Sequence, residues 1–131
     1  KVSVGMTAGT HGSTFGGNPL AMAAGNAVLD ILFEKDFFKK VKEKGEYFDE
    51  GLNKIKKKYP NIIKEIRGLG LIKGLKISVD TIKFIDKLIE NKMLTVKASE
   101  NVVRLFPPLI INNEELDESI YKIEKACKEM S

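Results

Sequence analysis

Apolar side chains recur along this chain with a helical period in some segments and in short β-rich runs in others. From Asp36 to Tyr59 the apolar positions step by four and three residues in turn, which predicts an amphipathic helix with lysines and glutamates on its other face. This stripe consists of Val41, Gly45, Phe48, Leu52, Ile55 and Tyr59. The segment is therefore expected to pack one face against a core and to leave the other face in water.

An earlier helix is predicted to begin at Asn18-Pro19, with Asn18 as the N-cap and Pro19 at the first helical position. Its apolar side chains again recur every three to four residues, and alanine and glycine fill much of the remaining surface. A helix with so little polar surface must pack on more than one side, so we expect it to need neighbours. The recurring positions are Leu20, Ala24, Ala27, Val28, Ile31 and Leu32.

The second half of the chain alternates β-rich runs with helical ones. Residues 62–77 are β-rich and contain three glycines, which predicts two strands joined through a glycine turn or bulge. Two further short strands are predicted over Met93–Lys97 and Val102–Phe106, and Leu109–Ile111 is expected to continue extended. Between the two strand pairs Thr81–Asn91 predicts a short helix, with inward side chains Ile82, Ile85, Leu88 and Ile89.

A final helix is predicted with Asn113 as its N-cap, which two glutamates follow as acidic first-turn residues. Its expected buried positions are Leu116, Ile120, Ile123, Cys127 and Met130. The order loop, α, α, β, β, α, β, β, α predicts an α+β domain in which helices cover a small sheet. We expect a loop rich in glycine, serine and threonine over residues 1–17, and a domain with its leading helix over residues 18–131.

Composition and charge exclude several kinds of partner. The net charge of +4 arises from 22 lysines and arginines against 18 acidic residues, and the basic residues are nearly all lysines mixed with acidic side chains. With two arginines and no tryptophan, the chain is not expected to bind nucleic acid. No apolar run approaches the roughly 18–20 residues of a membrane helix. The single cysteine fits a reducing cytoplasm.

Taken alone, the residues form no complete catalytic constellation. His11 is the only histidine, so a histidine-rich metal site is excluded and no metal is expected. Cys127 lies on the apolar stripe of the last helix, where a buried structural role is favoured over a nucleophile. The acidic residues show no spacing that indicates acid–base catalysis, and neither a GxxxxGK[ST] nor a GxGxxG pattern occurs.

The loop Gly9–Gly17 is the one segment that suggests ligand chemistry. Three hydroxyl residues, Thr10, Ser13 and Thr14, are interspersed with glycines just before a predicted helix N-terminus. Small side chains, exposed N–H groups and hydroxyls suit a phosphate. An ordinary glycine-rich connector has the same composition, so composition leaves both interpretations open.

The string G-T-H-G-S-T-F-G-G-N-P-L-A, Gly9 to Ala21, closely resembles the segment that follows the cofactor lysine in class III aminotransferases. Two weaker matches follow in the family's order: E-I-R-G-L-G-L-I-K-G at Glu65–Gly74 and N-V-V-R-L-F-P-P-L at Asn101–Leu109. Together they extend the resemblance over essentially the whole chain, and their form is most similar to the acetylornithine branch. The resemblance implies the small C-terminal domain of a fold-type I transferase that depends on pyridoxal 5'-phosphate.

The resemblance also implies roles for individual residues. In the family's homodimers this loop reaches the partner's active site, so Thr14 is expected to bind the phosphate of the partner subunit's cofactor, and Ser13 to lie beside it toward the substrate. Arg104 matches the arginine that receives the substrate α-carboxylate, a task that suits a planar guanidinium; without the match, a surface ion pair is the simpler interpretation. Arg67 is expected to be architectural, and His11 to hold the loop's shape by hydrogen bonds.

The family's chemistry also needs groups that this chain lacks. The lysine that forms the Schiff base, an aspartate for the pyridine nitrogen and an aromatic side chain for the ring all lie upstream of the G-T-H-G-S-T motif in these enzymes. Lys1 is too close to the loop to be that lysine. We therefore expect no catalytic residue in this chain, and no transamination by the chain alone.

The expected activity of the parent protein is transfer of an amino group from N-acetylornithine to 2-oxoglutarate in arginine biosynthesis, by a cytoplasmic homodimer. Ornithine or succinyldiaminopimelate remains open as the amino donor. An alternative of another class is a non-catalytic module that pairs with a separate large-domain chain or regulates it. The exposed alanine and glycine face of the first helix would suit such pairing.

Overall fold

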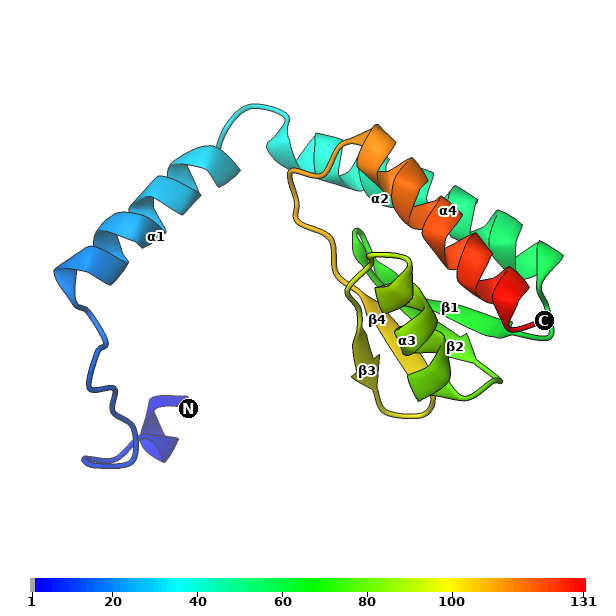
Figure 1. Cartoon of the computed structure of the whole chain (residues 1–131). Helices are drawn as coiled ribbons and strands as arrows, with labels where there is room; N and C mark the ends of the chain where they lie inside the picture. Colours follow the sequence, from blue (N-terminus) through cyan, green and yellow to red (C-terminus); the bar gives the residue numbers. More distant parts are fainter. Residues whose placement is uncertain (1) are drawn as a thin grey trace. The chain divides into compact units, whose positions relative to one another are not determined.

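A computed structural model describes residues 2–131, and Lys1 lies outside the described residues. The chain divides into two compact units, one that ends at Phe37 and one that covers Phe38–Ser131. The first unit contains a short 3₁₀-helix, Val2–Gly5, the glycine-rich loop and helix α1, Pro19–Leu32 (Figure 1). Among residues 2–131 no helix is long and apolar enough to cross a membrane.

Helix α1 begins where the sequence predicts. The Asn18 side chain accepts a hydrogen bond from the Ala21 N–H at 2.9 Å, and Pro19 occupies the first helical position. The same side chain donates from Nδ2 to the Phe15 carbonyl at 2.7 Å, which ties the loop to the helix start. No residue of α1 is buried, and Leu20 is 81% exposed. This exposure agrees with the expectation that the helix needs neighbours.

The second unit has the predicted α+β fold. Its four-stranded antiparallel sheet has the order β1-β2-β4-β3, and three helices cover one face of it (Figure 1). The strands are β1 Ile63–Leu69, β2 Ile72–Ile77, β3 Val96–Ala98 and β4 Val102–Leu105. The helices are α2 Phe37–Lys58, α3 Thr81–Glu90 and α4 Asn113–Glu129.

One apolar core lies between the three helices and the sheet. The predicted stripe of α2 is inside it: Phe48, Leu52 and Ile55 are buried, and Val41 and Tyr59 pack at its margin. The last helix contributes as predicted, with Ile120 and Met130 only partly buried. The remaining core side chains include Ile63, Leu71, Leu75, Ile77, Phe84, Leu88, Val103, Leu105, Leu116, Ile123 and Cys127.

Glycines determine how closely the helices and the first hairpin approach. A Cβ at Gly45 of α2 would lie 2.9 Å from the backbone of Gly70, in the β1–β2 turn. Gly70 itself has φ 57°, and Gly68 has φ 128°. A Cβ at Gly68 would lie 1.9 Å from the Ile72 carbonyl oxygen. The predicted glycine turn is therefore a tight hairpin in which Gly68 has no room for a side chain.

Four local predictions need correction. The buried side chains of α3 are Thr81, Phe84 and Leu88, because the face that meets α4 and the sheet runs along these positions; the expected Ile82 and Ile89 are exposed and Ile85 is half-buried. The third strand begins at Val96 instead of Met93. The other two corrections concern the segment that leads into α4.

Leu109 and Ile110 form a turn and do not continue extended, because the Ile111 N–H donates to the Pro108 carbonyl at 3.0 Å. Helix α4 is capped by Asn112, one residue before the predicted Asn113. With Asn112 as the cap, Glu115 stands at the third helical position, whereas a cap at Asn113 would place Leu116 there. The Glu115 N–H donates to the Asn112 side chain at 2.8 Å, and the Asn112 N–H donates to the Glu115 carboxylate at 2.9 Å. The reciprocal pairing therefore decides where the helix starts.

Candidate functional site: a hydroxyl loop and an arginine face

The loop before α1 is a series of tight turns made by its own backbone. The Thr10 N–H and hydroxyl both bond to the Thr7 carbonyl, at 3.2 and 2.7 Å. The Gly16 N–H then donates to the Ser13 carbonyl at 3.3 Å. We expected His11 to hold the loop's shape by hydrogen bonds, but it makes none with any other described residue. The backbone turns hold the loop's shape instead.

Ser13 and Thr14 present free hydroxyls on this loop. Both residues are exposed, and neither side chain is engaged by another residue of the described chain. A Cβ at Gly16 would lie 3.0 Å from Ser13 Cβ and 3.1 Å from its Oγ, so glycine leaves the space that the serine side chain occupies. Free hydroxyls beside glycines that allow close backbone approach fit a phosphate group.

The two arginines lie on the other unit, in a single row across the sheet. In the register, Arg67 of β1 pairs with Gly74 of β2, and Gly74 pairs with Arg104 of β4. Paired residues point to the same side of a sheet, and both arginines are exposed, so this row faces away from the helices. Because Gly74 has no side chain, nothing on β2 separates the two arginines.

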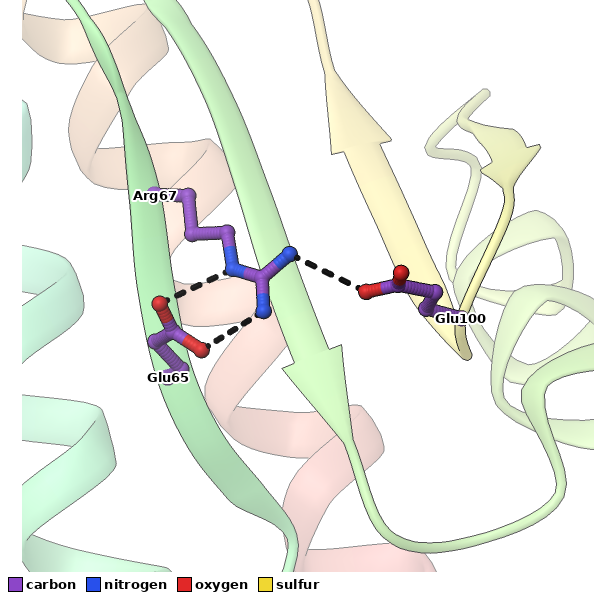
Figure 2. Close-up of polar contacts among 3 residues, drawn as sticks. All are labelled: Glu65, Arg67 and Glu100. Atoms are coloured by element: carbon purple, nitrogen blue, oxygen red, sulfur yellow. Dashed lines mark hydrogen bonds and ion pairs between the residues drawn. The ribbon is translucent and has the colours of Figure 1, made fainter.

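Arg67 is held by two carboxylates of its own chain. Its Nε and Nη2 contact the two oxygens of Glu65 at 2.8 and 2.9 Å, a bidentate pair, and its Nη1 lies 3.4 Å from Glu100 Oε2 (Figure 2). Hydrogen bonding to Glu65 and then to Glu100 raises the pKa of Arg67. Hydrogen bonding to Arg67 lowers the pKa of Glu65 from its ordinary value. The architectural interpretation of Arg67 agrees with these contacts.

The guanidinium of Arg104, in contrast to that of Arg67, is not paired with a carboxylate of the described residues. The Arg104 side chain makes no hydrogen bond or ion pair with any other residue that the structure describes. It lines an open hollow of about 370 Å³ on the sheet face, together with Arg67, Gly74 and Glu100. The surface ion pair that would be the simpler interpretation is therefore absent among residues 2–131. A free guanidinium over a glycine floor can bind a carboxylate with two parallel hydrogen bonds.

Lys73 is a buried charged residue that sequence reasoning missed. It is 2% exposed, and its Nζ lies 2.5 Å from Asp49 Oδ2 of α2. Its place in β2, in phase with the buried Leu75 and Ile77, was the available signal. The pair ties the sheet to the helix that covers it.

Cys127 is buried as expected, and burial raises the pKa of its thiol to about 12. A thiol with so high a pKa carries almost no thiolate at neutral pH, so it is not a nucleophile. No group of three or more histidine, cysteine or acidic side chains in the described part of the chain could hold a metal ion.

The chain belongs to the class III aminotransferase family, whose family model matches residues 1–127. The enzymes of this family are transaminases that use pyridoxal phosphate, and the small α+β fold of this chain is found in their solved structures.

Among curated relatives, the acetylornithine aminotransferase of Brucella melitensis is 46% identical over 131 residues, and that of Agrobacterium fabrum is 44% identical over 127 residues. These alignments cover 100% and 97% of this chain but only 32% of each relative. Among solved structures, the ornithine aminotransferase of Plasmodium yoelii matches with a TM-score of 0.85 and 32% identity, over 99% of this chain and 35% of that one. The chain thus spans about a third of the length of its relatives.

Proposed function

We propose that the whole protein transfers the amino group of N-acetylornithine to 2-oxoglutarate and serves arginine biosynthesis as a cytoplasmic homodimer. The names of the curated relatives support the amino donor. The fold and the free Arg104 support a site for a substrate that carries a carboxylate. In this proposal residues 1–17 end the large cofactor-binding domain, and residues 18–131 form the small domain with its leading helix.

The observation that carries the proposal is the difference between the two arginines. Arg67 is occupied by Glu65 and Glu100, whereas Arg104, on the same face, is free. A free guanidinium exposed in a hollow gives the α-carboxylate one place to bind, and the planar fork fixes the direction in which the amino group points. Arg104 therefore binds and orients the amino donor, and then the oxo acid.

The loop residues would hold the cofactor phosphate. Thr14 would donate its hydroxyl to the phosphate of the partner subunit's cofactor, and Ser13 would lie beside it toward the substrate. When bound, pyridoxal phosphate supplies an aldehyde that takes up the amino group and a ring that withdraws electrons from the reacting carbon. The residues of this chain bind and orient; the lysine that carries the cofactor is expected outside it.

Residues 2–131 contain one buried lysine, Lys73, and Asp49 already pairs with it. We therefore expect the 131-residue chain alone to show no transamination. Incubation with pyridoxal phosphate followed by borohydride would check this: an adduct at one specific lysine would contradict the expectation.

The substrate is tested by comparing amino donors with the purified whole enzyme. With 2-oxoglutarate as acceptor, we expect kcat/KM for N-acetylornithine to exceed those for ornithine and succinyldiaminopimelate by at least about tenfold. A preference for ornithine would instead favour the alternative suggested by structural relatives of that name. A folded whole enzyme that uses none of the three donors would refute the function, and would favour the non-catalytic pairing module.

Two variants of the whole enzyme test the residue roles. Arg104→Gln should raise KM for both substrates by about 30-fold or more, because a charge-assisted bidentate contact is lost; Lys76→Gln, which removes a positive charge from the same sheet face, is its control. Thr14→Ala should weaken cofactor retention about tenfold, the loss of one hydrogen bond to a charged group. Its control is Thr10→Ala, because the Thr10 hydroxyl is already used within the loop. An Arg104 variant with unchanged KM for either substrate would overturn the assignment.

A further inference from the structure

The hollow that contains the free Arg104 also contains a potential competitor for it. Glu100, at the β3–β4 turn, lines the same hollow of about 370 Å³. A side-chain carboxylate next to the arginine that binds the substrate can form an ion pair with that arginine and so compete with the substrate carboxylate. In the structure it does not, because Glu100 contacts Arg67 instead, at 3.4 Å.

We propose that Arg67 is a positioning residue: it holds the Glu100 carboxylate away from Arg104 and so keeps Arg104 free for the substrate carboxylate. This inference rests on the proposed role of Arg104. It assigns to Arg67 an effect on substrate affinity, in addition to its architectural contacts.

The geometry allows Arg67 to do this because of Gly74. Arg67 and Arg104 flank this glycine in one row, so the Arg67 side chain can reach over β2 toward the β3–β4 turn (Figure 2). The bidentate contact with Glu65, at 2.8 and 2.9 Å, fixes the plane of the guanidinium. The Nη1 atom of the guanidinium then remains available to contact Glu100.

The backbone of the turn is fixed independently of this contact. Glu100 and Asn101 have φ values of 61° and 59°, a left-handed pair of non-glycine residues. The Asn101 carbonyl accepts the Ile77 N–H at 3.0 Å, and its side-chain oxygen lies 3.4 Å from the Thr81 hydroxyl. Loss of Arg67 would therefore leave the turn in place and release only the Glu100 side chain, which would then be free to turn to Arg104.

The test is a rescue experiment in the whole enzyme. Arg67→Gln should raise KM for both substrates about three- to fivefold with kcat nearly unchanged, which is the effect of an exposed ion pair that competes for Arg104. Glu100→Gln alone should change KM less than about twofold. The double variant Arg67→Gln/Glu100→Gln should return to within about twofold of the unaltered enzyme, because the competitor is gone.

A purely structural Arg67 predicts a different pattern. The double variant would then be at least as impaired as Arg67→Gln, and that result would overturn the proposal, as would an unchanged KM in Arg67→Gln. The matched control is Lys76→Gln, which removes one positive charge from the outward face of β2 and should leave KM within about twofold.

A second measurement needs no activity and separates this inference from the proposed function. The 131-residue chain has two arginines, so in its Arg67→Gln variant the remaining arginine Nε–Hε signal in a ¹H–¹⁵N spectrum belongs to Arg104. We expect this signal to shift from its position in the unaltered chain, and to return when Glu100→Gln is added. A signal that does not move refutes the inference even if transamination is confirmed; the expected shift supports it even if the substrates prove different.

Discussion

Asp49→Asn should destabilise the domain strongly, although the Asp49 side chain is only half-buried. The change keeps the shape of the side chain and removes the charge that compensates Lys73. Lys73 is 2% exposed, and its Nζ has Asp49 Oδ2 as a partner at 2.5 Å. A buried ammonium without its counter-charge is costly, and removing one partner of a buried pair costs about 3–5 kcal/mol.

The magnitude for this pair should lie at or below the lower limit of that range. The Asp49 side chain is 41% exposed, so water reaches one side of the pair and can solvate part of the uncovered charge. We therefore expect a loss of about 2–3 kcal/mol, which for a domain of this size lowers Tm by roughly 10–20 °C. Urea unfolding followed by circular dichroism would measure the loss directly.

The control is Lys73→Met, which removes the buried charge and keeps most of the apolar stem. Replacing a buried charge by an apolar side chain of similar length is often nearly neutral, so we expect a loss of at most about 1 kcal/mol. The double variant should resemble Lys73→Met, since no uncompensated buried charge remains. Equal losses in the two single variants, or a loss below about 0.5 kcal/mol for Asp49→Asn, would refute the reasoning.

Two further predictions concern the β1 strand. Gly68→Ala should lower the free energy of unfolding by at least about 2 kcal/mol, because the added Cβ meets the Ile72 carbonyl oxygen at 1.9 Å and φ is 128°. Gly51→Ala should cost less in the same urea titration, since its Cβ meets the flexible end of the Ile120 side chain. A larger loss for Gly51→Ala than for Gly68→Ala would contradict this reasoning. Hydrogen bonding to Arg67 lowers the pKa of Glu65, so Glu65 contributes stability above its unfolded pKa and loses it as pH falls through the lowered value. Between about pH 5 and pH 3 the free energy of unfolding should therefore depend less on pH in Glu65→Gln than in the unaltered protein. Glu43→Gln, on the exposed side of α2, should show the same pH dependence as the unaltered protein.

Much of the fold follows from local patterns. The stripe of α2, the cap at Asn18 and the glycine hairpin are each set by residues close together in the sequence, so their signals are complete within one segment. The error in α3 arose because that decision depends on distant residues, whereas the turn at Leu109–Ile110 and the cap of α4 are local features that the pattern of apolar positions does not report. The inward face of α3 is set by α4 and the sheet, so Ile82 and Ile89, which fit a helical stripe equally well, are exposed.

The candidate site divides in the same way. Family motifs in the sequence are sufficient to single out Ser13, Thr14 and Arg104, and their roles stay predictions. The pairing of Lys73 with Asp49 joins residues 24 positions apart, and no spacing rule connects them.

What the sequence by itself determined is the family, the α+β order of elements and the residues that could bind phosphate and carboxylate. Only the tertiary structure decided which of the two arginines is free. In the sequence Arg67 and Arg104 stand in similar strand contexts, 37 positions apart. The antiparallel register places both beside Gly74, and the β3–β4 turn brings Glu100 to Arg67. Whether an arginine is free or paired depends on which carboxylates the fold places next to it. Strand register and turn geometry decide that placement.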